Sequence, residues 1–124
     1  MKDKRPVNLD LFTIKLPLAA YTSITHRISG VIVFVGVAVL LWLFDMSLSS
    51  EAGFDQLKKL AGSGLFRFIL WVILSALAYH MVAGIKHLLM DAGIGESKEG
   101  GPLGAKITIL VSLILIIGLG VWIW

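Results

Sequence analysis

The chain has 124 residues, of which 57% are hydrophobic and 15% are charged, with a net charge of +3 and a mean hydropathy of +0.90. A soluble domain carries about 25% charged residues, so this composition excludes an ordinary soluble enzyme and predicts an integral membrane protein. The chain contains no cysteine, which excludes disulfides, protein-ligated iron–sulfur clusters and a covalently attached haem.

The N-terminal segment, residues 1–22, is predicted to lie outside the membrane. Pro6 and Pro17 interrupt any long helix there. Its apolar side chains suit either the membrane surface or a contact with a partner protein, and the sequence leaves both alternatives open. The first long apolar run starts only at residue 28, so we expect no cleavable signal peptide.

The first span is predicted over residues 23–45. It contains an uncharged run over residues 28–44, close to the length of about 20 residues that crosses a bilayer core. Just before this run, the spacing of four residues places them on one helix face: Ser23, His26, Arg27 and Gly30. By itself this cluster fits a simple topology anchor.

The same cluster also suits a quinone. Negative charge develops on the carbonyl oxygens of a quinone during reduction, and hydrogen-bond donors and a fixed cation stabilise that charge in a low-dielectric site. Ser23 supplies a hydroxyl group and Arg27 supplies the cation. The residues alone therefore leave both interpretations open, a topology anchor and a quinone site.

A loop over residues 46–64 follows, and it is predicted to be periplasmic. Apolar residues at helical spacing within it indicate a short interfacial helix. Ser50 is the predicted N-cap of this helix and Gly62 its end. We assign this helix no chemistry.

The second span is predicted over residues 65–89, and it contains His80. An ionisable group inside a membrane is costly and is a functional hypothesis by default. Ala76 and Gly84 lie four residues on either side, which leaves a flat strip where a porphyrin can approach an iron-ligating imidazole. A polar contact between packed helices is the alternative interpretation. His87 lies seven residues further on, at the level of the lipid headgroups, as a propionate partner or an interface histidine.

The remaining elements are a Gly-rich cytoplasmic connector over residues 90–103 and a third span over residues 104–124, which ends with Trp122 and Trp124 as aromatic anchors. Basic residues set the predicted orientation. Eight of them flank the cytoplasmic side and three flank the other side: Lys2, Lys4, Arg5, Lys15, Arg27, Lys86, Lys98 and Lys106, against Lys58, Lys59 and Arg67. They form no stripe, so we expect no nucleic-acid binding.

These placements bring the start of the first span close to His80. A haem on His80 would carry its propionates near the headgroups, where His26 and Arg27 are predicted partners because a guanidinium binds carboxylates in a bidentate fork. The chain offers only one deep histidine, whereas a six-coordinate haem needs two axial ligands. The ligand count therefore predicts a partner chain.

Three motifs carry a resemblance to a known family. Residues 5–11 read RPVNLDL, residues 23–30 read SITHRISG, and residues 80–93 read HMVAGIKHLLMDAG. The chain resembles the cytochrome b membrane subunit of succinate dehydrogenase, particularly the bacterial form. The similarity covers nearly the whole chain. One departure is Lys86, where the family pattern prefers arginine.

The resemblance implies an all-α integral membrane protein, with three transmembrane helices that contribute to a helical bundle with a partner subunit. It implies non-covalent haem b with His80 as the axial ligand to the iron, His26 and Arg27 at the propionates, and Ser23 and Arg27 at ubiquinone. The implied partners are a second small membrane anchor that supplies the other axial histidine, an iron–sulfur subunit and a flavoprotein subunit. Electrons would run from succinate to ubiquinone, with no residue catalytic on this chain alone.

The implied location is a bacterial inner membrane, with the N-terminus cytoplasmic and the C-terminus periplasmic. Two alternatives remain: a cofactor-free membrane anchor, and the anchor of a quinol:fumarate reductase, in which the chemistry runs in reverse. A pore or transport subunit is disfavoured, because the third span carries only Thr108 and Ser112 as polar residues.

Overall fold

The computed structural model describes residue 12 and residues 14–124, and the predictions for residues 1–11 and 13 lie outside the described residues. The described part contains four helices: α1 (Leu18–Ser49), α2 (Glu51–Ala61), α3 (Gly64–Asp91) and α4 (Gly100–Ile123). Three of them, α1, α3 and α4, are long and apolar enough to cross a membrane. The prediction of an all-helical membrane protein with three spans is confirmed.

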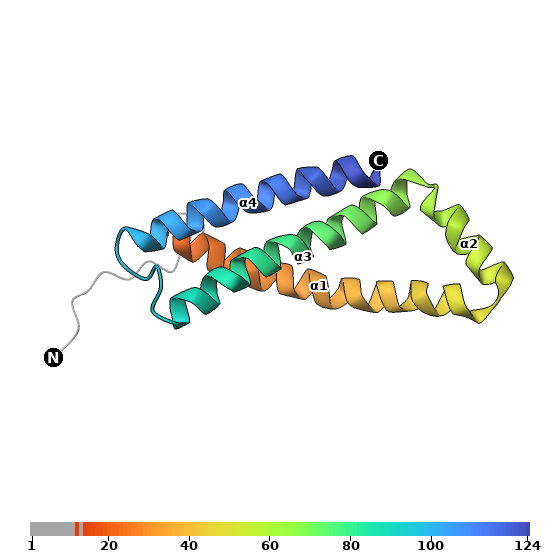
Figure 1. Ribbon diagram of the computed structural model, residues 1–124, viewed down its shortest axis with the longest axis horizontal. Helices are drawn as coiled ribbons and strands as arrows, with labels where there is room; N and C mark the ends of the chain where they lie inside the picture. The colour runs from red at the N-terminus through yellow and green to blue at the C-terminus, as the bar shows by residue number, and fades with distance from the viewer. Residues whose placement is uncertain (1–11, 13) are drawn as a thin grey trace.

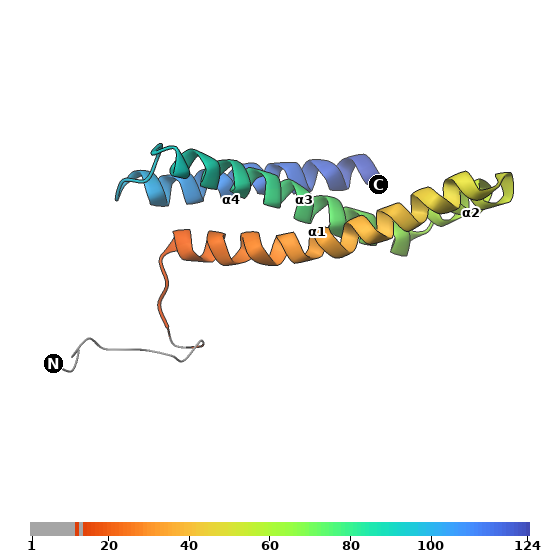
Figure 2. The same ribbon diagram turned by 90° about the horizontal axis from the view of Figure 1, so that it is seen from below.

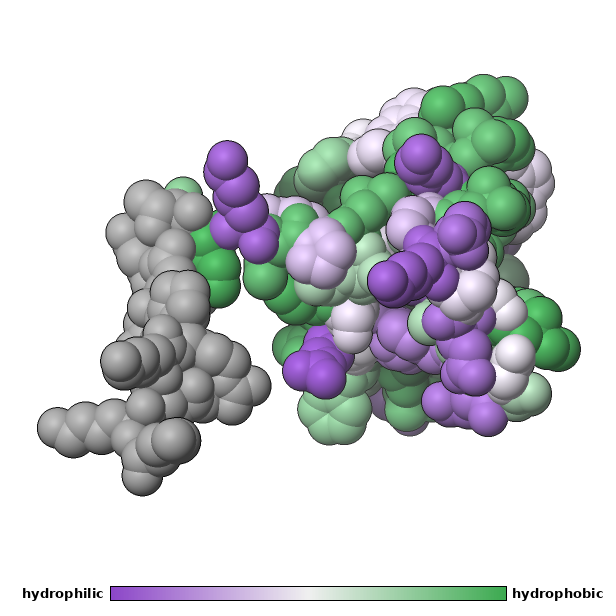
Figure 3. Space-filling view, turned by 90° about the vertical axis from the view of Figure 1, so that its left-hand side faces the viewer, coloured by the Kyte–Doolittle hydropathy of each residue, from purple (hydrophilic) through white to green (hydrophobic). Residues whose placement is uncertain are grey.

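The long helices form two layers. Helices α3 and α4 lie antiparallel and side by side, and α1 crosses α3 from the other layer (Figures 1 and 2). Helix α2 joins α1 to α3 at one end of the bundle. The other end brings together the start of α1, the end of α3 and the start of α4. Hydrophilic residues gather at that end, and apolar residues surround them (Figure 3).

Local sequence sets where the helices begin. Pro17 has φ of −65° and ψ of 156°, and its carbonyl accepts hydrogen bonds from Ala20 and Tyr21, so α1 begins at Leu18, before the predicted span start at residue 23. Helix α2 begins where the Ser50 hydroxyl accepts from the Gly53 amide at 2.9 Å, and it ends at Gly62. Both predicted ends of this short helix are confirmed.

Small residues make the closest helix contacts. A Cβ atom added to Gly36 of α1 would lie 2.7 Å from Cγ2 of Ile73 in α3, so the two helices cross there at a distance that only glycine permits. In α4, the buried residues are all small: Gly101, Ala105, Thr108 and Ser112. Large apolar side chains point outward instead, with Phe34 81% exposed and Val121 77% exposed. This inverted arrangement is what a bundle surrounded by lipid requires.

A hydrogen bond at one end of the α3–α4 layer and a glycine turn at the other connect the two helices. The indole nitrogen of Trp71 in α3 donates to the carbonyl of Ile116 in α4 at 2.9 Å, at the end of the layer near α2. At the other end, Gly93 and Gly95 adopt positive φ of 84° and 74°. These left-handed conformations favour glycine and allow the chain to turn from α3 into α4.

Candidate functional site

Three histidines from two helices meet at the hydrophilic end of the bundle. The rings of His26 in α1 and His80 in α3 are stacked, with centroids 4.1 Å apart and planes 10° apart. The ring of His87, two turns further along α3, lies 5.1 Å from that of His26 at an angle of 56°. The structure therefore brings together His26 and His80, which the sequence predicted as neighbours, and adds His87 to them.

The orientation of the His80 ring is set by α1. Its Nδ1 lies 3.1 Å from the carbonyl oxygen of His26 and 3.1 Å from the hydroxyl of Ser29, which is buried and itself donates to the His26 carbonyl at 2.6 Å. A carbonyl oxygen can only accept, so a hydrogen bond to it places the imidazole proton on Nδ1. The other nitrogen, Nε2, then carries a lone pair, which is the form in which imidazole binds a metal.

Two glycines make room for this stack. A Cβ atom on Gly30 would lie 3.0 Å from Cε1 of His80, and one on Gly84 would lie 3.4 Å from Nε2 of His26. The sequence predicted Gly84 as part of a strip that admits a porphyrin, and in the structure the His26 ring occupies the space beside it. Nε2 of His26 is buried and has no hydrogen-bond partner within the described residues.

Ser23 and Arg27 lie apart from the imidazole stack. Each directly follows a residue that faces α3, Thr22 and His26, and is therefore turned by about 100° around α1. Ser23 is half-buried and Arg27 is exposed, and neither makes a side-chain hydrogen bond or ion pair with any residue that the structure describes. Of the cluster predicted at the start of the first span, His26 and Gly30 lie against His80.

Lys86, which the sequence counted among the cytoplasmic basic residues, turns into the bundle. Its side chain is only 8% exposed, and Nζ donates to the Thr22 hydroxyl of α1 at 3.2 Å. Its Cε lies 3.7 Å from a Cβ position on Gly104, so the side chain runs between α3 and α4 to reach α1. The sequence pattern did not reveal this contact, because Lys86, Thr22 and Gly104 belong to three different helices.

A tyrosine that the sequence did not single out supports the same contact. The Tyr79 hydroxyl donates to the Thr22 carbonyl at 3.0 Å and lies 2.5 Å from the Thr25 hydroxyl. Together with Lys86, it ties the first turns of α1 to α3. The turns that carry Ser23 and Arg27 are therefore held in place from the opposite side of the helix.

Comparison with known proteins gives consistent matches. The family of succinate dehydrogenase/fumarate reductase transmembrane subunits matches residues 1–119. The succinate dehydrogenase cytochrome b556 subunit of Coxiella burnetii (strain RSA 493 / Nine Mile phase I) is 41% identical over 125 aligned residues, which cover 100% of both chains. The cytochrome b556 subunit of Paracoccus denitrificans is 33% identical over 92% of this chain and 88% of the relative. The cytochrome b560 subunit of Reclinomonas americana is 32% identical over 75% of this chain and 68% of the relative.

Proposed function

Because the chain belongs to the succinate dehydrogenase/fumarate reductase transmembrane subunit family, we propose that its histidine cluster binds haem b and that the neighbouring face of α1 binds ubiquinone. The chain is a multi-pass cytochrome b membrane subunit of a succinate dehydrogenase, as the sequence predicted. It is part of an enzyme but not catalytic alone.

The observation that supports haem binding best is the fixed His80 ring. With Nδ1 directed at the His26 carbonyl and at Ser29, Nε2 is the nitrogen available to the haem iron. A haem b bound there would supply a one-electron carrier within the membrane. One imidazole is arranged in this way among the described residues, so the second axial ligand belongs to a partner subunit. His26, with its unpartnered Nε2, and Arg27 are the proposed propionate contacts.

The quinone proposal depends on the outward face of α1. Ser23 and Arg27 have no partner in the described chain, and a site between subunits requires donors that remain free until assembly. Arg27 holds a fixed positive charge opposite the developing oxyanion, and Ser23 donates a hydrogen bond to a quinone oxygen. Both lie in the first turns of α1, near the aqueous border from which protons are drawn.

The proposed orientation in the membrane follows from the distribution of basic residues. The N-terminal segment and the α3–α4 connector lie in the cytoplasm, and the C-terminus faces the periplasm of a bacterial inner membrane. The site end of the bundle would then face an iron–sulfur subunit and a flavoprotein subunit that deliver electrons from succinate. A second small membrane anchor completes the haem site.

The haem assignment is tested in the purified complex by the reduced-minus-oxidised optical spectrum. We expect His80→Leu to shift or abolish the reduced haem b absorption, because no other ring in the cluster is held in the same way. His87→Leu is the matched control, and it should keep the low-spin spectrum. An unchanged spectrum in the His80 variant would remove the ligand assignment, and a wild-type complex without any haem spectrum would favour a cofactor-free anchor.

A further inference from the structure

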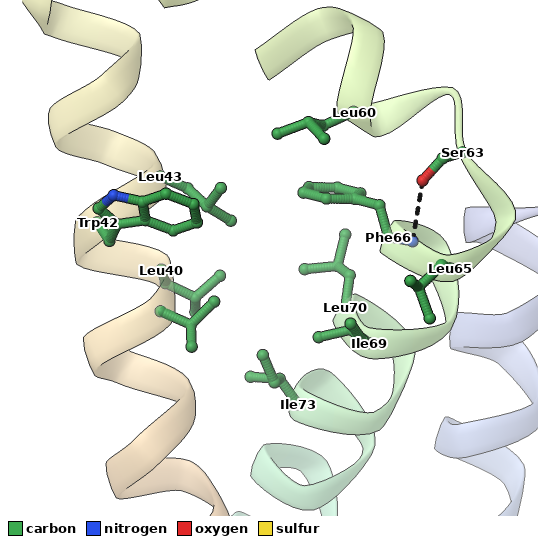
Figure 4. A pocket seen from close by; sticks show the side chains of 11 residues that line it. Leu40, Trp42, Leu43, Leu60, Ser63, Leu65, Phe66, Ile69, Leu70 and Ile73 are labelled. Carbon is green, nitrogen blue, oxygen red and sulfur yellow. Dashed lines mark hydrogen bonds between the residues drawn. The ribbon is translucent and has the colours of Figure 1, made fainter. Parts of the chain in front are cut away.

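An apolar cavity lies at the end of the bundle away from the histidines. Beyond their crossing at Gly36 and Ile73, α1 and α3 diverge, and α2 joins their ends (Figure 1). The cavity of about 220 Å³ lies between these three helices. Leu43 from α1, Leu60 from α2, and Phe66 and Leu70 from α3 lie around it (Figure 4).

The lining is almost entirely apolar. Its one hydroxyl, on Ser63, accepts a hydrogen bond from the Phe66 amide at 3.1 Å, and the only other polar side-chain atom is the indole nitrogen of Trp42 (Figure 4). A buried water needs two to four polar partners, so this space favours an apolar occupant.

The surroundings of the cavity indicate what can enter it. The cavity is partly open rather than enclosed. Because α1 and α3 span the membrane, lipid surrounds them, and a hydrocarbon chain is the apolar occupant available there.

Two cations at the same corner indicate what the hydrocarbon chain is attached to. Arg67 directly follows Phe66, and its Nε donates to the Ala61 carbonyl at 3.2 Å, which turns the side chain back toward the α2–α3 turn. Lys59 precedes Leu60. Lys58 pairs with Asp55 at 3.5 Å, whereas neither Arg67 nor Lys59 has a carboxylate partner among the described residues.

We propose that this corner is a binding site for one phospholipid, with an acyl chain in the cavity between α1, α2 and α3 and the phosphate beside Arg67 and Lys59. An arginine fork suits a phosphate group. The lipid fills the space left by the diverging helices and ties α2 to the bundle. This site does not depend on the haem and quinone assignments, because it lies at the opposite end of the molecule.

The test counts phospholipids retained by the whole complex. The complex is purified in mild detergent, washed free of loosely bound lipid, and analysed by native mass spectrometry. We expect Leu70→Phe, which fills the cavity, to remove one phospholipid per copy of this chain. Leu113→Phe is the matched control, because Leu113 is an exposed residue of α4 that lines none of the cavities between helices, and it should retain that lipid. Both variants should keep the haem spectrum, which shows that they assemble.

A second measurement does not require the cavity variant to fold. A phospholipid with a photoactivatable acyl chain, added to the wild-type complex and irradiated after washing, should label peptides that contain Leu43 and Phe66. Lys59→Gln with Arg67→Gln should lower this labelling severalfold. Equal lipid counts in the Leu70 and Leu113 variants, or labelling confined to other subunits, would overturn the proposal and indicate that a partner side chain fills the cavity.

Discussion

The imidazole of His80 shows how one neighbouring hydroxyl sets the chemistry of a ring. Ser29 and the His26 carbonyl both approach Nδ1, and Gly30 leaves the ring only just enough space, at 3.0 Å from its Cβ position. Metal-ligating histidines are commonly held by a hydrogen bond at the second nitrogen, which fixes the tautomer and the ring plane. The stack on His26 limits rotation as well, so the free nitrogen is presented in one direction.

We expect the side chain of Arg27 to support quinone reduction. Arg27→Leu should lower ubiquinone reductase activity by roughly 10²-fold, the lower range for removing one preorganised charge-stabilising group. Succinate oxidation with a soluble artificial dye should survive, because that reaction does not need the membrane site. The quinone reductase activity of Arg27→Lys should lie between those of the wild type and the Leu variant, since lysine keeps the positive charge but lacks the planar guanidinium group. Lys98→Leu, in the exposed connector, serves as the control for loss of one positive charge.

The two activities separate the possible outcomes. Equal loss of dye and quinone reduction would indicate failed assembly and would contradict a quinone-specific role. Wild-type quinone turnover in the Leu variant would contradict the role of the cation directly.

At the scale of elements, the crossing of α1 and α3 depends on a single glycine. Gly36→Ala places a methyl group 2.7 Å from Cγ2 of Ile73, a buried β-branched side chain with little freedom to move. We expect this substitution to lower the free energy of unfolding by about 1–3 kcal/mol, as overpacking does elsewhere. Thermal unfolding of the solubilised complex measures the change.

Gly118→Ala is the control for that substitution. A Cβ atom at Gly118 in α4 meets nothing within 4 Å, so alanine there should be neutral or slightly stabilising. The double variant Gly36→Ala with Ile73→Ala should be less destabilised than the sum of the single changes, because they share one contact. Strict additivity would mean that the two residues do not meet.

The elements show where sequence reasoning succeeds and where it stops. The three long helices follow from uncharged runs, and both ends of α2 follow from local capping at Ser50 and Gly62. His80 and His26 were placed together because both lie near the same membrane border. The inward course of Lys86 was not predictable, since it depends on Gly104 and Thr22 from other helices. The periodicity of the sequence shows which residues share one face of a helix. It does not show which other helix packs against that face.

We predict that α2 faces the periplasm and that the α3–α4 connector faces the cytoplasm. The chain has no cysteine, so a single introduced thiol is the only one it carries. We expect Gln56→Cys in α2 to react with an impermeant maleimide in intact spheroplasts, because the sparse basic residues put that side outside. Glu96→Cys in the α3–α4 connector should react only after lysis. Both positions are exposed, so burial does not confuse the comparison. The reverse pattern would show that the subunit sits the other way across the bilayer.

The outward-facing side chains of the three long helices have a consequence for handling the protein. Within the described residues, no large side chain is fully buried, and most of the buried residues are small, with Ile73 and Lys86 as the exceptions. The chain therefore lacks a hydrophobic core that would hold its helices together after extraction. Their arrangement depends on the surrounding lipid. Harsh detergents should separate the helices from one another without unfolding them. A lipid nanodisc should preserve their arrangement.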